Sequence, residues 1–280
     1  MKILRLLVKI VFAAAALFVI MLAGLCVISS DELEREYYRI SSPKITGSSD
    51  IRIVAISDLH NKVFGYNNSE LVSAIDMLDP DLILIAGDMV NKDSDDVETA
   101  LSLCMELKEI APLYYGFGNH EGSMVYNRGI RFDQILYANG IKLLINNAES
   151  IDIKGNTLDI GSVSTDEEGY DEYARSFVEN FEKSDHFKIM ITHLPKVYYT
   201  KMADVDIDLN IAGHFHGGQI RLPLVGGLFS PEFGFFPKYC SGEFELKNGK
   251  LIVSRGLGNH TAIPRINNSP EITVIDLSAG

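Results

Sequence analysis

Five apolar stretches of this sequence each end in residues that commonly bind metal ions. These residues are Asp58 and His60, Asp88, Asn119 and His120, His193, and His214 with His216. The stretches themselves, 51–57, 81–87, 112–118, 186–192 and 208–213, are rich in residues that favour buried strands. The carboxyl ends of parallel strands share one edge of an α/β sheet, so residues far apart in sequence can meet in one crevice there. The pattern therefore predicts a single site with carboxylate, amide and imidazole ligands.

Each motif taken alone also has an ordinary structural explanation. Asp58 and His60 would present alternate side chains to the same face of an extended segment, but a D-x-H sequence often occurs by chance. Asp88 after Gly87 could belong to a turn or cap a helix, and a lone histidine is usually structural. Five of the seven histidines, however, stand at predicted strand ends. That coincidence favours one metal site over five unrelated structural roles.

In chain order, the segments SDLH, GDMVN, GNHE, THLP and GHFHGG resemble the motifs of the calcineurin-like metallophosphoesterase superfamily. The resemblance implies an α/β fold arranged as a four-layer α/β/β/α sandwich. It also implies a binuclear metal centre, with Asp58, His60 and His216 on one ion, Asn119, His193 and His214 on the other, and Asp88 bridging both. His120, which is not a ligand in the family, would stabilise the transition state or protonate the leaving oxygen, a task that suits a group titrating near neutrality.

The expected cofactors are two divalent metal ions. Mixed imidazole, carboxylate and amide ligands suit Mn, Fe, Zn or Ni, whereas sites made only of oxygen suit Mg or Ca. Two such ions about 3.5–4 Å apart can hold a bridging hydroxide that attacks phosphorus in line, and they neutralise the charge that repels it. The expected activity is metal-dependent hydrolysis of a phosphoester or pyrophosphate bond.

The N-terminal 30 residues predict a membrane-spanning helix. Residues 10–30 contain no charged side chain, and about 20 apolar residues suffice to cross a bilayer. Lys2, Arg5 and Lys9 precede this run and acidic residues follow it, so the positive-inside rule predicts a single-pass signal anchor with the catalytic domain outside the cytoplasm. A cleaved signal peptide is the alternative, although its apolar region usually has only about 7–15 residues.

The remaining chain reads as a linker at 31–49 and one phosphoesterase domain at 50–280. Helical patterns at 67–79, 95–110, 131–140 and 167–183 alternate with the predicted strands, as in α/β folds. Asn68 or Ser69, and Ser94 or Asp95, are expected as helix N-caps. After residue 217 short strand-like pieces predict a second layer of sheet, with a hairpin turn at 248–249.

The charge of the chain argues against nucleic acid as a partner. Without the three basic residues of the N-terminal segment, 22 basic and 38 acidic side chains remain, a net charge near −16. A surface of that charge repels polyanions, so a nuclease of the same superfamily is the less favoured enzyme.

Two downstream segments bear on the substrate. GGQIRLP and SRGLGNHTAIPRINNSPEI resemble a membrane-associated bacterial subgroup similar to UDP-2,3-diacylglucosamine hydrolases. This resemblance implies a small phosphorylated or lipid-linked substrate, such as a phosphoester or pyrophosphate of a lipid or a nucleotide-sugar. Arg221 and Arg265 in these segments could contact a phosphate and His260 could line the pocket, but surface salt bridging or loop packing is the favoured explanation for each of them. The alternative to an enzyme is a membrane-tethered metal-binding scaffold without turnover, which would be expected to have lost ligands.

Overall fold

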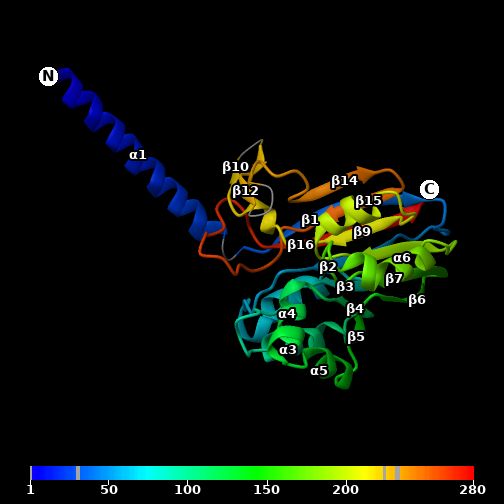
Figure 1. Ribbon diagram of the computed structural model, residues 1–280. Coiled ribbons are helices and arrows are strands. Elements are labelled where there is room, and N and C mark those ends of the chain that lie inside the picture. The colour runs from blue at the N-terminus through cyan, green and yellow to red at the C-terminus, as the bar shows by residue number, and fades with distance from the viewer. Residues whose placement is uncertain (1, 30–31, 223–224, 231–233) are drawn as a thin grey trace.

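Two six-stranded sheets lie face to face, with helices on the outer side of each (Figure 1). The computed structural model describes residues 2–29, 32–222, 225–230 and 234–280. The strand order is β1-β16-β2-β3-β4-β5 in the first sheet and β14-β15-β9-β8-β7-β6 in the second. Since helices pack on both outer faces, the fold is the predicted four-layer α/β/β/α sandwich.

The first sheet contains three of the predicted strands at its centre. Its members are β1 (Glu34–Ser42), β2 (Ile51–Ile56), β3 (Leu82–Ala86), β4 (Leu113–Gly116), β5 (Lys142–Leu144) and β16 (Glu271–Ala279). Its outer face is covered by α2 (Ser69–Asp76), α3 (Glu98–Leu107), α4 (Asn119–Arg128) and α5 (Phe132–Ala138), with η1 (Tyr66–Asn68) leading into α2. In β2, Ile53 packs between the sheets and Val54 packs under the helices, so both faces of the strand are buried. This double burial explains the nearly continuous apolar runs.

The second sheet is built in the same way. Its strands are β6 (Asn147–Ile153), β7 (Asn156–Ser162), β8 (Phe187–Ile191), β9 (Leu209–Ala212), β14 (Gly242–Leu246) and β15 (Gly249–Val253). Its outer face packs against η2 (Tyr170–Ala174), α6 (Arg175–Phe181), α7 (Pro195–Val197) and η3 (Tyr198–Met202). Between β9 and β14 lie η4 (His216–Gly218) and the short strands β10 (Arg221–Leu222), β11 (Gly226–Gly227), β12 (Phe229–Ser230) and β13 (Gly234–Phe235). All five predicted strands are therefore present, three in one sheet and two in the other.

Several local predictions differ from the structure. Within the predicted linker, Glu34–Ser42 forms the edge strand β1, which pairs in parallel with β16. The sequence concealed this strand because six of its nine residues are exposed and its partner lies more than 230 positions away. The segment after β4, for which no helix was predicted, is helix α4.

The helix caps and the hairpin also differ in detail. Asn68 precedes α2 as its N-cap but makes no cap hydrogen bond, and its Oδ1 accepts from the Phe64 N–H instead. Before α3 it is Asp96, rather than Ser94 or Asp95, whose carboxylate accepts from the first N–H groups of the helix. The hairpin between β14 and β15 is present, with its two-residue turn at 247–248.

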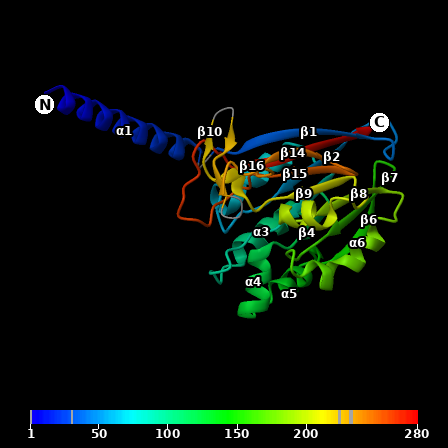
Figure 2. The same ribbon diagram turned by 45° about the horizontal axis from the view of Figure 1, so that its top comes forward.

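The long helix α1 (Lys2–Ser29) projects away from the sandwich (Figures 1 and 2). Its segment Ile3–Met21 is long and apolar enough to cross a membrane and is not buried against the domain. A signal sequence would share these properties. The boundary predicted at residues 30 and 31 lies outside the described residues.

Candidate metal centre

The five predicted strand ends meet at one end of the sandwich. β2, β3 and β4 are followed by Asp58, Asp88 and Asn119, while β8 and β9 of the other sheet are followed by His193 and His214. The prediction of one shared crevice therefore holds, although two sheets supply it rather than one.

The backbone that carries these side chains is not extended, as the sequence reasoning assumed. Asp58, His60 and Asp88 have φ angles of 53°, 49° and 54°, and His214 and His216 have 76° and 48°. Left-handed backbone is unfavourable for residues other than glycine and is found at functional sites that the surrounding structure holds in place. The paired ligands converge because the chain turns sharply after each strand, not because of the strand pleat.

Asp88 lies at the middle of the cluster. Its Oδ2 is 3.0 Å from His193 Nε2, 3.9 Å from His120 Nε2 and 4.0 Å from His60 Nε2. Its Oδ1 accepts a 2.8 Å hydrogen bond from the His120 N–H near the start of α4. Asp88 thus does cap a helix, but its second oxygen faces three imidazole rings, as a bridging ligand requires.

Asp58 occupies the neighbouring position. Its Oδ1 is 3.7 Å from His216 Nε2, 3.9 Å from His60 Nε2 and 4.0 Å from His193 Nε2. The His214 N–H donates to both oxygens of this carboxylate, at 3.1 and 3.2 Å. The main chain after β9 is thereby fixed to the end of β2, which joins the two sheets at the site.

Asn119 and His214 lie toward the outside of the cluster. Donor atoms of Asp88, His193 and His214 all lie within 4.8 Å of one another, close enough to share an ion. Asn119 is the exposed first residue of α4 and borders the same cavity as His193. Gly118 before it is essential, because a Cβ there would come within 2.2 Å of Asp88 Oδ1.

The buried nitrogen atoms of the cluster fit a metal-binding role. Both ring nitrogens of His60 and of His216 have no hydrogen-bond partner although they are buried. Buried polar atoms are normally hydrogen-bonded, and unpartnered ones require an explanation. Imidazole and carboxylate groups crowded together with free lone pairs form a donor set that suits two divalent cations.

Two imidazoles of the cluster have pKa values that suit metal binding. Burial lowers the pKa of His60 to about 3 and holds the pKa of His216 well below its usual range. Neutral imidazole is the form that binds metals. Burial acts to raise the pKa of Asp88, but neighbouring imidazoles outweigh it and hold that pKa well below its usual range. Burial also acts to lower the pKa of His193, but Asp88 and Asp58 raise it to about 10.

His120 is held differently from the other histidines. Its Nδ1 accepts a 3.1 Å hydrogen bond from the Lys92 N–H, so in the neutral ring the proton resides on Nε2. That nitrogen faces Asp88 Oδ2 at 3.9 Å. Burial lowers the pKa of His120 to about 4, partly offset by Asp88. The ring therefore presents an N–H donor to the centre.

Glu121 is a buried residue near the centre whose role the sequence reasoning missed. Its carboxylate accepts from the N–H groups of Asp88, Met89 and Gly118 at 2.8, 2.7 and 2.9 Å, and from the Tyr115 hydroxyl at 2.7 Å. It thereby ties the turn after β3 to the start of α4. A Glu at the third position of a predicted helix would have indicated a capping role for Glu121, but no helix was predicted there.

We expect Glu121→Gln to destabilise the domain. A glutamine amide would place N–H groups against donors, so at least one buried backbone N–H would lose its acceptor. The expected cost is about 2–3 kcal/mol, which lowers Tm by about 4–12 °C in a domain of this size. Thermal unfolding followed by circular dichroism measures it, with Glu149→Gln, an exposed carboxylate paired with Lys142, as the control. An unchanged Tm would show that these hydrogen bonds contribute little.

The structure gives different roles to the three weaker candidates, Arg221, Arg265 and His260. Arg265 is 4% exposed, and its guanidinium donates to the carbonyls of five residues, which excludes a phosphate contact. Arg221 donates to Ser241 Oγ and to the Gly217 carbonyl. His260, by contrast, lies with its ring centroid 4.5 Å from that of His60. Loop packing explains the two arginines, whereas His260 belongs to the centre.

Two cavities border the centre. One of about 540 Å³ lies between α4 and the 163–169 loop, beside Asn119 and His193, and is lined by apolar and aromatic side chains such as Phe117 and Tyr126 together with uncharged polar ones such as Asn127. The other, of about 460 Å³, lies beside His120 and His260 and has a polar lining. Both are large enough for parts of a small-molecule substrate.

Comparison with known proteins agrees with this geometry. The family model described as calcineurin-like phosphoesterase matches residues 51–218, more than half of the chain. YkuE, an uncharacterized metallophosphoesterase of Bacillus subtilis (strain 168), is 27% identical over 244 residues, 83% of this chain and 81% of YkuE. Phosphodiesterase YaeI of Escherichia coli (strain K12) is 27% identical over 234 residues, 82% of this chain and 83% of YaeI.

Among solved structures, a dimetal phosphatase from Danio rerio matches 75% of this chain and 88% of its own, with a TM-score of 0.44 and 11% identity. The family match spans every predicted ligand from Asp58 to His216. The chain therefore belongs to the calcineurin-like phosphoesterase family and is a metal-dependent phosphoesterase.

Proposed function

We propose that this protein is a membrane-anchored phosphohydrolase with a binuclear metal centre. The observation that carries the proposal is the set of unpartnered, buried imidazole nitrogens of His60 and His216 beside the carboxylates of Asp58 and Asp88. Asp58, His60 and His216 would hold one ion, and Asn119, His193 and His214 the other, with Asp88 between them. Two divalent ions would lower the pKa of water and neutralise phosphoryl charge. Mn, Fe, Zn and Ni all suit these ligands.

The chain's own contribution to the chemistry is positioning and proton transfer. Water adds to phosphorus while the bond to the leaving oxygen breaks, and the leaving oxygen then requires a proton. His120 Nε2–H faces the centre and is the donor we assign to one of two tasks. As imidazolium the ring would transfer this proton to the leaving oxygen and return to the neutral form, and as neutral imidazole it would hydrogen-bond the charge that develops on the phosphoryl oxygens. The backbone bond from Lys92 to His120 Nδ1 keeps the ring in the orientation required.

The two cavities support a substrate that extends on both sides of phosphorus. None of the described residues lining the larger cavity is a lysine or arginine, and Asp166 is among them. A group bound there would therefore be apolar or uncharged rather than a second phosphate. This favours a phosphodiester with an apolar arm, such as a lipid phosphoester, over a nucleotide-sugar pyrophosphate.

The test compares two chromogenic substrates on the full-length protein loaded with Mn²⁺. Hydrolysis of bis-p-nitrophenyl phosphate and of p-nitrophenyl phosphate would be measured with Asp88→Asn as the blank. We expect turnover that depends on Asp88 and is faster with the diester. Two bound metal ions without turnover of either ester would favour the metal-binding scaffold instead, and strong salt-sensitive DNA binding would favour a nuclease.

The position of α1 supports anchoring close to the active site. Near the end of α1, Ser29 is buried, and its Oγ accepts a hydrogen bond from the Asn268 N–H at 3.3 Å. The Asn268 side chain in turn donates to the His216 carbonyl at 2.7 Å. If α1 spans the cytoplasmic membrane as the positive-inside rule predicts, the metal centre lies at the membrane-facing end of an extracytoplasmic domain. Protease added to intact cells should then remove the domain.

Exposed apolar side chains gather on the loops at this end, here called the apolar rim: Val225, Phe235, Phe236 and Ile263. The rim loops are hydrogen-bonded together, since the Arg221 N–H donates to the Ile266 carbonyl and the Phe236 N–H to the Leu228 carbonyl. In both views, β10 and the loop between β15 and β16 lie beside the base of α1 (Figures 1 and 2). The rim would therefore touch the bilayer that α1 enters.

We expect Phe235→Asp combined with Phe236→Asp to impair hydrolysis of membrane-embedded esters only. Each buried phenylalanine contributes about 1.5–3 kcal/mol on leaving water, so the expected loss is roughly tenfold or more. The assay uses full-length protein in vesicles with a p-nitrophenyl phosphodiester that carries an acylglycerol arm, and soluble p-nitrophenyl phosphate as reference. Met77→Asp, an exposed apolar residue before the amino end of β3, is the control. Equal losses on both substrates would contradict a membrane role for the rim.

A further inference from the structure

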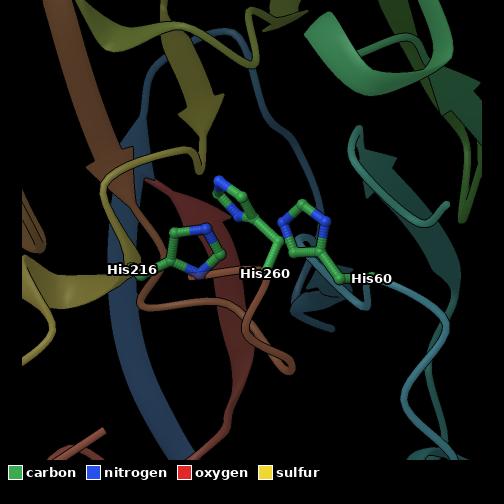
Figure 3. A group of neighbouring side chains, drawn as sticks. All are labelled: His60, His216 and His260. Carbon is green, nitrogen blue, oxygen red and sulfur yellow. The ribbon is translucent and has the colours of Figure 1, made fainter. Parts of the chain in front are cut away.

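His260 lies among the candidate metal-binding histidines although it belongs to none of the five predicted ligand motifs. Its ring centroid is 4.5 Å from that of His60, 4.7 Å from that of His120 and 5.1 Å from that of His216. Ring nitrogens of His60, His216 and His260 all lie within 4.8 Å of one another. Figure 3 shows the three rings gathered around one space, each from a different segment of the chain.

The loop that carries His260 is attached to the segment that carries Asp58 and His60. The Leu257 N–H donates to the Ser57 carbonyl at 3.0 Å, and the Gly258 N–H donates to the Asp58 carbonyl at 2.6 Å. A Cβ on Gly258 would stand 2.0 Å from the Leu59 carbonyl oxygen, so only glycine permits this approach. The distance between His60 and His260 is therefore set by backbone contacts.

Buried polar groups hold the rest of the loop. The Arg265 guanidinium donates to the carbonyls of Arg255, Gly256 and Gly258 at 2.8, 3.0 and 2.8 Å. The Asn259 side chain donates to the Ile263 carbonyl at 2.8 Å. These bonds fix the loop on both sides of His260. They also give a structural role to Arg265, which is buried at the edge of the centre.

We propose that His260 is an additional ligand of the metal ion held by Asp58, His60 and His216, a step that rests on the binuclear centre proposed above. Both ring nitrogens of His60 and His216 are buried without partners, so a third imidazole completes a nitrogen-rich face that suits a divalent cation. The first ion then has three imidazole ligands and the second has two. Imidazole-rich sites favour Zn, Ni or Fe over Mn, so the two positions should differ in metal preference.

The test titrates Co²⁺ into metal-free, full-length protein and into His260→Ala, followed by calorimetry and by the visible absorption of bound cobalt. We expect one of two sites to weaken by about 10–100-fold or more, since even outer contacts of metal ligands have that effect. The cobalt spectrum of that site should also change, while the second site stays as in the wild type. His186→Ala removes a half-exposed imidazole outside the centre, paired with Asp159, and should match the wild type.

Two results would overturn the proposal. If both sites of His260→Ala bind Co²⁺ with wild-type affinity and spectrum, His260 is not a ligand, and a raised KM in the same variant would make it a substrate contact. If the wild type itself binds no Co²⁺, the proposed binuclear centre is contradicted, and with it the proposal that His260 is a ligand. Thermal unfolding of the metal-free variants separates either result from a folding defect.

Discussion

Asp88→Asn should lower kcat for p-nitrophenyl ester hydrolysis by about 1,000-fold or more. The carboxylate oxygen Oδ2 lies within 4.0 Å of the Nε2 atoms of His60, His120 and His193. Its negative charge is therefore close to both proposed metal positions. A metal centre supplies several kcal/mol of charge stabilisation in the transition state, and about 1.4 kcal/mol corresponds to tenfold in rate. Removing the charge shared by both ions therefore affects both halves of the centre.

The substitution is well suited to a kinetic test because asparagine preserves the local structure. Its side-chain oxygen can still accept the His120 N–H bond that Asp88 Oδ1 accepts at 2.8 Å, so the start of α4 should remain intact. Turnover and bound metal would be measured together, with thermal unfolding as a check on folding. Asp171→Asn, a half-exposed carboxylate paired with Arg175, is the matched control. Activity within tenfold of the wild type would rule out a bridging role.

His120→Asn should lower kcat by about 100–10,000-fold, the usual contribution of a positioned proton donor, while bound metal changes little. The expectation follows from the orientation of the ring. Nδ1 is occupied by the Lys92 N–H, and the remaining N–H faces the centre without serving as a predicted ligand. Loss of metal in proportion to activity would show instead that His120 binds an ion.

The leaving group decides between the two roles that His120 could have. p-Nitrophenolate leaves readily without a proton, whereas phenolate depends much more on protonation. If His120 Nε2–H protonates the leaving oxygen, the loss in His120→Asn is larger for phenyl phosphate than for p-nitrophenyl phosphate. If it stabilises charge on the phosphoryl oxygens, the two losses are similar.

The sequence predicted the strands and the segments that meet because both depend on local chemistry. Apolar runs buried on two faces identify β2, β3, β4, β8 and β9, and the residues after them must lie at strand ends whatever the rest of the chain does. The same local logic predicted the apolar helix α1. The sequence did not predict β1. Its exposed residues form a strand only because they pair with β16, which lies far along the chain.

The sequence by itself determined which residue types stand at the ends of five strands, and hence a metal-dependent phosphoesterase. Tertiary structure alone decided how those residues meet. It set the left-handed turns at Asp58 and Asp88, tied the turn at Asp88 to the start of α4 through Glu121, and brought His260 from a loop some 200 residues away to lie beside His60. The physical reason is that the spacing of apolar residues along a strand shows only which face of the strand is buried. The distance between two loops depends instead on hydrogen bonds and packing among segments that are far apart in the sequence.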